Sequence, residues 1–107
     1  MRRIQSISER EDDNPMDPIS VVFEADARRS AAYKDGELIG ECEFCLTDGK
    51  WAITHTGVRP AYGGQGIAKR LVISVIEAAR ANQMKILPIC SYAKKLMEGK
   101  DEFKDVL

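Results

Sequence analysis

The chain has 107 residues, of which 44% are hydrophobic, and this length and composition suit a single small domain with one core. Sixteen Lys and Arg against seventeen Asp and Glu give a formal net charge of −1, and no segment gathers the block of like charges that typically binds nucleic acids or anionic membranes. No apolar run approaches the roughly 18 residues of a membrane-spanning helix, and the N-terminus has no apolar signal region, so a cytoplasmic location is expected.

Residues 1–17 are expected to form a disordered tail, because they are rich in charged residues and offer few apolar side chains for burial. Residues 18–107 are expected to form the single domain. Its first half alternates short β-favouring runs with turn signals, and Asp35-Gly36 and Asp48-Gly49 are typical of two-residue hairpin loops. The sequence therefore predicts an antiparallel meander of three or four strands. These strands are expected over residues 21–23, 30–34, 38–46 and 51–58.

Two of the three cysteines lie in this meander, and the third follows later, at position 90. An odd number of sparsely spaced cysteines argues against a disulfide framework, so at least one thiol is expected to be free. Cys42 and Cys45 have the C-x-x-C spacing of many metal sites, but an offset of three places their side chains on opposite faces of a strand. Without a second pair of Cys or His residues, no metal site is expected.

The hydrophobic period changes after the meander. Apolar residues three and four positions apart predict a helix of about four turns that ends near Asn82. Its charged residues lie mostly on the other side and are expected to face solvent. The buried face of the helix is expected to consist of Ile67, Leu71, Val72, Val75, Ile76 and Ala79.

A second β-rich run follows the helix over residues 84–90, and after it come about two helical turns before Gly99 and a tail over residues 101–107. A strand, a helix and a strand in this order form a βαβ unit, whose two strands run parallel. Pro88 cannot donate a hydrogen bond to a neighbouring strand, so pairing should weaken there, as an edge strand tolerates. The expected fold class is α+β, with a mixed sheet.

Three glycines, Gly63, Gly64 and Gly66, immediately precede the predicted helix. The first turn of a helix leaves N–H groups unpaired, and glycines let an anion such as phosphate approach them closely. A plain connecting turn is the alternative. Two familiar phosphate loops do not fit: the P-loop needs its lysine directly after a glycine, and the dinucleotide fingerprint needs a glycine where Lys69 stands.

A resemblance to a known family lies in the segment ITHTGVRPAYGGQGIAKRLV. It resembles motif A of the GNAT superfamily of acetyl-CoA-dependent N-acetyltransferases, usually written [RQ]-x-x-G-x-[GA]. Gly63 stands where Arg or Gln is usual. With the later ILPIC and SYAKKLM segments, the likeness extends to a short single-domain branch and covers roughly residues 19–107. It implies a minimal GNAT fold, in which antiparallel N-terminal strands precede a βαβ unit and a short C-terminal helix.

The resemblance also implies acetyl-CoA as co-substrate, with no metal. Backbone amides of the glycine loop would hold the coenzyme A pyrophosphate, and the preceding strand would align the pantetheine arm. In the family the arm inserts between two parallel strands that splay apart, which is a second explanation for Pro88. The residues implied for coenzyme binding are Thr56, Gly57, Val58, Gly63, Gly64, Gln65, Gly66, Ile67, Ala68 and Lys69.

Cys90, His55 and Tyr92 are the candidate catalytic residues. Cys90 ends a parallel strand and precedes a short helix, whose N-terminus favours a thiolate, and the resemblance implies that it accepts the acyl group or lies against the thioester. An ordinary buried cysteine is the alternative. His55, on the neighbouring strand, could activate Cys90 or simply pack. Tyr92 resembles the tyrosine with which many GNAT enzymes protonate the leaving thiolate, although a packing role is open.

The expected function is N-acetyl transfer from acetyl-CoA to an amine, either directly or through Cys90. The alternative is a non-catalytic acyl-CoA-binding module, because only residues 25–29 separate the first two strands, where longer GNAT enzymes build much of the acceptor pocket. A structural interaction domain without a coenzyme is a third alternative. The partner is expected to be a small-molecule or protein amine, and the chain a monomer or weak dimer.

Overall fold

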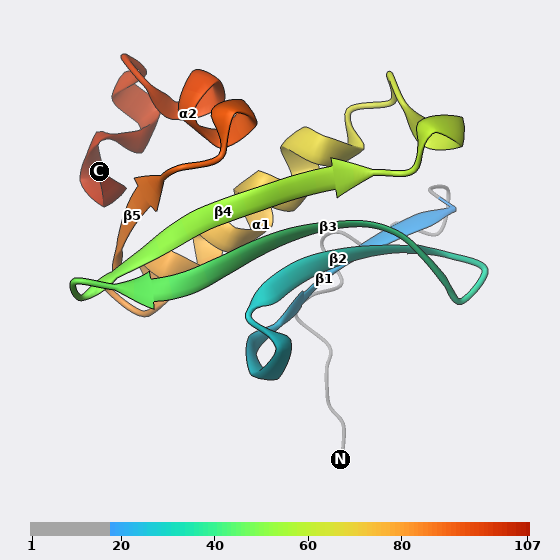
Figure 1. Cartoon of the computed structure of the whole chain (residues 1–107), viewed down its shortest axis with the longest axis horizontal. Coiled ribbons are helices and arrows are strands. Elements are labelled where there is room, and N and C mark those ends of the chain that lie inside the picture. The colour runs from blue at the N-terminus through green and yellow to red at the C-terminus, as the bar shows by residue number, and fades with distance from the viewer. Residues whose placement is uncertain (1–17) are drawn as a thin grey trace.

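The computed structural model describes residues 18–107 (Figure 1). The expected tail, residues 1–17, lies outside the described residues. The strands are β1 (Ile19–Glu24), β2 (Arg29–Lys34), β3 (Glu37–Thr47), β4 (Lys50–Val58) and β5 (Lys85–Pro88). The α-helices are α1 (Ile67–Ala81) and α2 (Ser91–Met97), and short 3-10 helices are η2 (Ala25–Ala27), η3 (Pro60–Tyr62) and η4 (Asp101–Val106).

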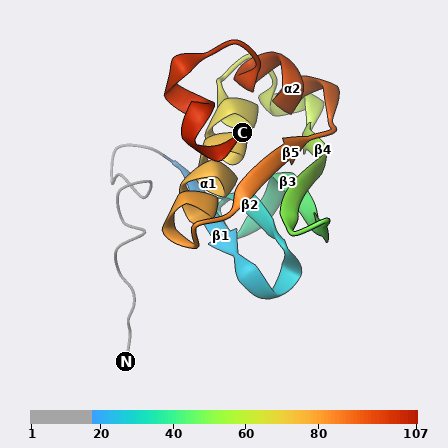
Figure 2. The same cartoon turned by 90° about the vertical axis from the view of Figure 1, so that its left-hand side faces the viewer.

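The five strands form one sheet in chain order, β1-β2-β3-β4-β5. The first four are antiparallel neighbours, and β5 runs parallel to β4. The α+β prediction, with a mixed sheet, is therefore confirmed. Helix α1 contacts every strand from one side, and Figure 2 shows no helix of the described chain covering the other side of β2, β3 and β4. We call that uncovered side, which carries Arg29, Glu41 and His55, the open face.

Both predicted hairpin loops are present. Asp35 and Gly36 have φ values of 52° and 80°, and Asp48 and Gly49 have φ values of 53° and 74°. Strand pairing resumes directly on either side of each loop. Two consecutive residues with positive φ give a turn whose twist matches that of the flanking strands, which is why the Asp-Gly pairs fix the meander.

Helix α1 supplies six of the nineteen buried residues that form the hydrophobic core of residues 18–107. The six side chains predicted for its buried face are those that the structure buries: Ile67, Leu71, Val72, Val75, Ile76 and Ala79. Beneath them, the buried Ser30 hydroxyl of β2 donates a 2.6 Å hydrogen bond to the Leu71 carbonyl oxygen, which fixes the helix on the sheet. No helix among residues 18–107 has the combined length and hydropathy needed to span a bilayer.

The tail predicted after Gly99 is wrong, because residues 101–106 form η4. Phe103 and Val106 bury their side chains in the core next to α1. Arg80 of α1 holds the segment from outside, with its Nε 2.8 Å from Asp105 Oδ2. Two apolar residues three positions apart in a charged segment are too weak a pattern to predict this docking from the sequence.

Strands β4 and β5 diverge about halfway along β4. Their pairing runs from Lys50 opposite Lys85 to Ile53 opposite Pro88, whereas β4 continues to Val58. The Ile53 carbonyl closes the pairing by accepting hydrogen bonds from two successive amides, those of residues 89 and 90. β5 is thus both an edge strand and a strand that diverges from its neighbour after Pro88.

Candidate functional site

The glycine loop leaves the N-terminus of α1 uncovered. Gly64 and Gly66 have φ values of 77° and 78°, and Gly66 is the N-cap residue, with no side-chain hydrogen bond to the first turn. A Cβ atom at either glycine would meet no other atom within 4 Å. The loop residues 63–66 are all exposed. The first-turn amides therefore face open space, as an anion site at a helix N-terminus requires.

Gly63, where the resemblance leads one to expect Arg or Gln, has an ordinary φ of −65°. A Cβ atom there would lie 3.4 Å from the Pro60 carbonyl oxygen, which is normal van der Waals contact. Nothing in the backbone requires glycine at this position. The departure from the motif removes a side chain but does not reshape the loop.

The predicted coenzyme residues follow one line through the molecule, from the free half of β4 to the first turn of α1. Thr56, Gly57 and Val58 lie where β4 has no β5 partner, so the backbone on that edge is unpaired within the described sheet. Lys69 is exposed in the first helical turn. Ile67 differs, because its side chain is buried in the core, so only its backbone can contribute to an anion site.

Cys90 lies at the point where β4 and β5 diverge and is the N-cap residue of α2. Its Sγ lies 3.6 Å from Thr56 Oγ1, to which the thiol donates a hydrogen bond. Burial raises the pKa of the Cys90 thiol, but hydrogen bonds with the backbone amides of Ala93, Tyr92 and Thr56 and with the Thr56 hydroxyl outweigh burial, so the net pKa is below its ordinary value. The nucleophilic thiolate of this half-buried cysteine therefore forms at lower pH than that of an ordinary cysteine.

The buried Cys42 on β3 lies on the other side of Thr56. The Thr56 hydroxyl donates to Cys42 Sγ at 3.5 Å, so it bridges the two sulfur atoms. Burial raises the pKa of Cys42 to about 11, which keeps this thiol neutral. Cys45, by contrast, is exposed, so Cys42 and Cys45 lie on opposite faces of β3 as predicted. Among residues 18–107, no three Cys, His, Asp or Glu side chains gather as a metal site would require.

The structure does not bring His55 to Cys90. His55 is exposed on the open face, where a Cβ atom on Gly57 would lie 3.0 Å from its Nε2, so the imidazole ring lies over Gly57. Thr56, which contacts Cys90, points to the opposite side of β4, as neighbouring strand residues do. Tyr92, the second residue of α2, has 40% of its side chain exposed.

A charged network on the open face was not foreseen from the sequence. Arg29 on β2 contacts two carboxylates: its Nε lies 2.8 Å from Glu24 Oε1 and its Nη1 2.9 Å from Glu41 Oε1. The Tyr33 hydroxyl also donates to Glu24. The available signal was Arg29 on β2 and the alternating Glu41 and Glu43 on β3. Their partners depend on register, however, and a bulge between Ala32 and Tyr33 alters it.

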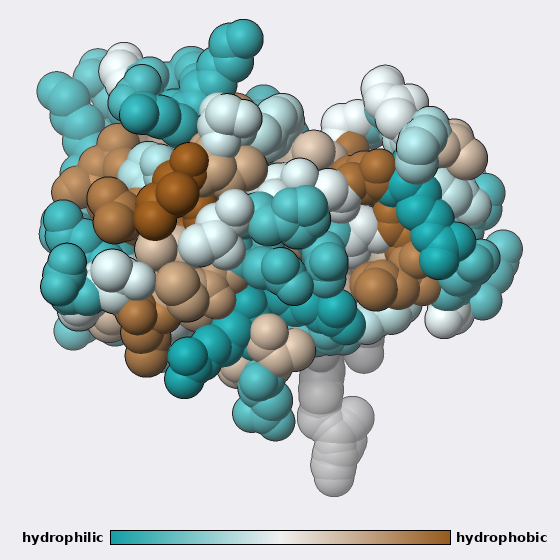
Figure 3. All heavy atoms as spheres, in the orientation of Figure 1, coloured by the Kyte–Doolittle hydropathy of each residue, from teal (hydrophilic) through white to brown (hydrophobic). Residues whose placement is uncertain are grey.

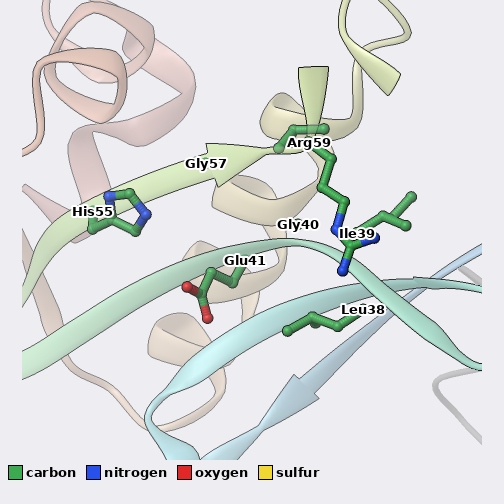
Figure 4. A pocket seen from close by; sticks show the side chains of 8 residues that line it. Leu38, Ile39, Gly40, Glu41, His55, Gly57 and Arg59 are labelled. Carbon is green, nitrogen blue, oxygen red and sulfur yellow. The ribbon is translucent and has the colours of Figure 1, made fainter. Parts of the chain in front are cut away.

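A pocket of about 220 Å³ opens beside this network, between β3 and β4 (Figure 4). Figure 4 shows Glu41 and His55 towards one end of it and Arg59 towards the other. We call it the open-face pocket. It is lined by Leu38, Ile39, Gly40, Glu41, His55, Gly57, Val58 and Arg59.

Comparisons with known proteins agree on one family. A family model described as GCN5-related N-acetyl-transferase matches residues 29–106. A GCN5-like N-acetyltransferase from Staphylococcus aureus, solved by NMR, is 34% identical, and the match has a TM-score of 0.60 and covers 74% of this chain and 79% of that chain. No curated protein sequence matches the chain.

Two crystal structures match over parts of longer chains. A GCN5-related N-acetyltransferase from Sphaerobacter thermophilus is 26% identical with a TM-score of 0.54, over 74% of this chain and 22% of that chain. A ribosomal-protein-alanine N-acetyltransferase from Brucella melitensis biovar Abortus 2308 is 26% identical with a TM-score of 0.53, over 65% of this chain and 57% of that chain. With the family model spanning most of the described residues, the chain belongs to the GCN5-related N-acetyltransferase (GNAT) family.

Proposed function

We propose that the chain binds acetyl-CoA along β4 and the glycine loop and transfers the acetyl group to an amine by way of Cys90. One observation carries the proposal: a hydrogen-bonded thiol with a lowered pKa lies where β5 leaves β4. The unpaired edge of β4 leads from that thiol to the open N-terminus of α1. The edge offers backbone donors and acceptors to the amide groups of the pantetheine arm, and the helix N-terminus offers amides to the pyrophosphate.

The transfer takes place in two steps. The Cys90 thiolate attacks the acetyl carbonyl carbon, a new carbon–sulfur bond forms, and the bond to coenzyme A breaks, so the coenzyme leaves as a thiolate that is then protonated. A neutral amine next attacks the thioacetyl carbon, forms the amide, gives up one proton to solvent or to a base, and releases the Cys90 thiolate. Amides of Tyr92 and Ala93, with the Thr56 hydroxyl, stabilise that thiolate.

Intact mass after incubation with acetyl-CoA, without an amine, tests the acyl-enzyme. The wild-type protein is expected to gain one acetyl group, Cys90→Ala none, and Cys45→Ala as much as wild type. Cys45 is the matched control because it is an exposed thiol away from the β4–β5 junction. An unmodified wild-type protein, or an adduct that persists in Cys90→Ala, contradicts the acyl-enzyme step.

Coenzyme binding is tested separately by thermal denaturation with coenzyme A. A ligand at about 100 times its dissociation constant stabilises the folded state by about 2.7 kcal/mol. Stabilisation of both wild type and Cys90→Ala is expected, because the Cys90 side chain lies apart from the glycine loop. Binding without an adduct and without turnover would instead support the non-catalytic acyl-CoA-binding module.

A further inference from the structure

The open-face pocket lies beside the proposed coenzyme site and has no role yet. Three residues of β4, at positions 55, 57 and 58, belong both to the pocket wall and to the half of the strand that β5 leaves unpaired. A molecule in the pocket would thus lie across β4 from the thiol and the coenzyme edge. With a volume of about 220 Å³, the pocket is smaller than the roughly 300–1,000 Å³ of sites for drug-sized ligands, so it suits a small metabolite or a single side chain.

One end of the pocket is anionic. The Glu41 carboxylate is half-buried, and its Oε1 accepts a 2.9 Å hydrogen bond from Arg29 Nη1, which fixes its orientation. Its other oxygen accepts no hydrogen bond from another side chain of the described residues, so it is available to a ligand. The His55 imidazole lies nearby over Gly57 (Figure 4). A carboxylate beside an imidazole suits an ammonium group, because the carboxylate offers a negative charge and the imidazole a second polar partner.

The other end of the pocket is cationic. Arg59 follows β4, and among side chains of residues 18–107 it is engaged only through its Nη1, at 2.6 Å from Glu37 Oε2. A guanidinium group has further N–H donors in one plane, a geometry that suits a carboxylate. Because Glu41 is paired with Gly57, Arg59 lies two residues farther along β4, or about 7 Å along the strand. The two charged ends are therefore separated by roughly the length of a short carbon chain.

Apolar surface joins the two ends. Leu38 supplies an apolar side chain, and Gly57 adds no side chain on this face. Ile39 and Gly40 also line the pocket, although the Ile39 side chain is 1% exposed and a Cβ atom on Gly40 would point to Leu71 in the core. Figure 3 shows brown, apolar residues beside the teal charged network on this face of the molecule. A ligand with charged groups at both ends and methylene groups between them matches this order of polar, apolar and polar lining.

We infer that the open-face pocket binds the acceptor, and that the acceptor is an amino carboxylate with a short aliphatic chain between its ammonium and carboxylate groups. That the bound amine is acetylated rests on the proposed function, whereas binding of the amino carboxylate in the pocket does not. The ammonium lies between Glu41 and His55, and the carboxylate lies against Arg59. Free ω-amino acids and the ε-amine end of free lysine share this chemistry.

Binding is tested without coenzyme, by following backbone amide NMR signals during titration with three probes: 6-aminohexanoate, hexylamine and glycine. Saturable shifts of the residue 41 and 57 amides are expected to be strongest with 6-aminohexanoate. Glu41→Gln is expected to weaken binding about tenfold, because a half-buried charge-assisted contact is lost. Arg59→Gln is expected to weaken it about fivefold, because Arg59 is more exposed, and to leave hexylamine binding unchanged.

The matched controls are Glu43→Gln, on the same face of β3 but outside the pocket lining, and Lys50→Gln, at the opposite end of β4; both are expected to bind like wild type. Equal affinity for 6-aminohexanoate and hexylamine, or no effect of Arg59→Gln, overturns the amino carboxylate. Shifts elsewhere, or none, overturn the pocket. The affinity of the pocket for free lysine, compared with its affinity for 6-aminohexanoate, then separates the two sources of this chemistry, free lysine and ω-amino acids. If 6-aminohexanoate binds in the pocket but acetyl-CoA gives no adduct on the protein, the pocket proposal is supported and only the acyl-enzyme step is refuted.

Discussion

Thr56 stands between two cysteines of opposite character, and its hydroxyl links them. Cys90 has a lowered pKa and Cys42 a raised one, although both contact the same oxygen atom. The difference comes from the surroundings, because Cys42 is enclosed by apolar side chains, whereas backbone amides at the start of α2 surround Cys90. The Thr56 hydroxyl lowers the pKa of both thiols, so their opposite net shifts come from burial at Cys42 and from the backbone amides at Cys90.

Thr56→Val removes this hydroxyl while keeping the shape of the side chain. Cys90 then loses one of the hydrogen bonds that lower its pKa, so the pKa rises and alkylation by iodoacetamide requires higher pH. We expect the pH midpoint of the alkylation rate, measured by mass spectrometry in a Cys45→Ala background, to move upward. Thr54→Val, which changes an exposed threonine two residues earlier on β4, serves as the control. An unshifted midpoint in Thr56→Val would show that the hydroxyl has no part in tuning the thiol.

The glycines of the loop differ in what they require. Gly64→Ala forces a side chain into a positive φ, and we expect a loss of about 1 kcal/mol in the free energy of unfolding. Gly63→Arg meets no such strain and places a cation beside the open helix N-terminus. We expect unchanged stability and tighter coenzyme A binding, measured by urea denaturation and calorimetry. Weaker binding by Gly63→Arg would place the pyrophosphate elsewhere.

Among the elements, η4 carries more stability than its length suggests. Phe103 is 3% exposed and packs into the core with Val106, so Phe103→Ala is expected to lower the free energy of unfolding by about 3 kcal/mol. Asp105→Asn removes only an exposed partner of Arg80 and is expected to change stability little. Urea denaturation compares the two variants. Similar, small losses would mean that η4 is held by its charges at the surface rather than by the core.

The elements that could be predicted from the sequence are those with strong local patterns. The Asp-Gly pairs fix both hairpins, and six apolar residues at helical spacing fix the buried face of α1. The charged network around Arg29 could not be predicted, because it depends on cross-strand register, and two bulges change that register. The pairing of Cys90 with Thr56 rather than with His55 has the same cause.

For the whole molecule, the raised pKa of Cys42 predicts how stability falls in alkali. The folded state favours the neutral thiol, so the contribution of Cys42 is complete below its ordinary pKa of 9.0 and is lost as the pH rises towards about 11. A difference of two pKa units corresponds to roughly 3 kcal/mol at most. The free energy of unfolding is measured by urea titration between about pH 8 and about pH 11, the range that brackets the ordinary and the raised pKa of Cys42. This free energy is expected to fall less steeply with pH in Cys42→Ala than in wild type. Parallel curves would contradict the burial of a neutral thiol.

One extra residue in β4 decides which of two neighbouring side chains meets Cys90. Glu43 pairs with His55 and Phe44 with Ile53, so Thr54 has no partner on β3 and interrupts the alternation. Without this interruption, His55 would share the core side with Ile53, and Thr56 would turn to the open face. Deleting Thr54, by contrast, is expected to remove the bulge but to keep His55 on the open face and Thr56 towards Cys90, because the shortened strand then alternates regularly from Ile53 through His55 to Thr56.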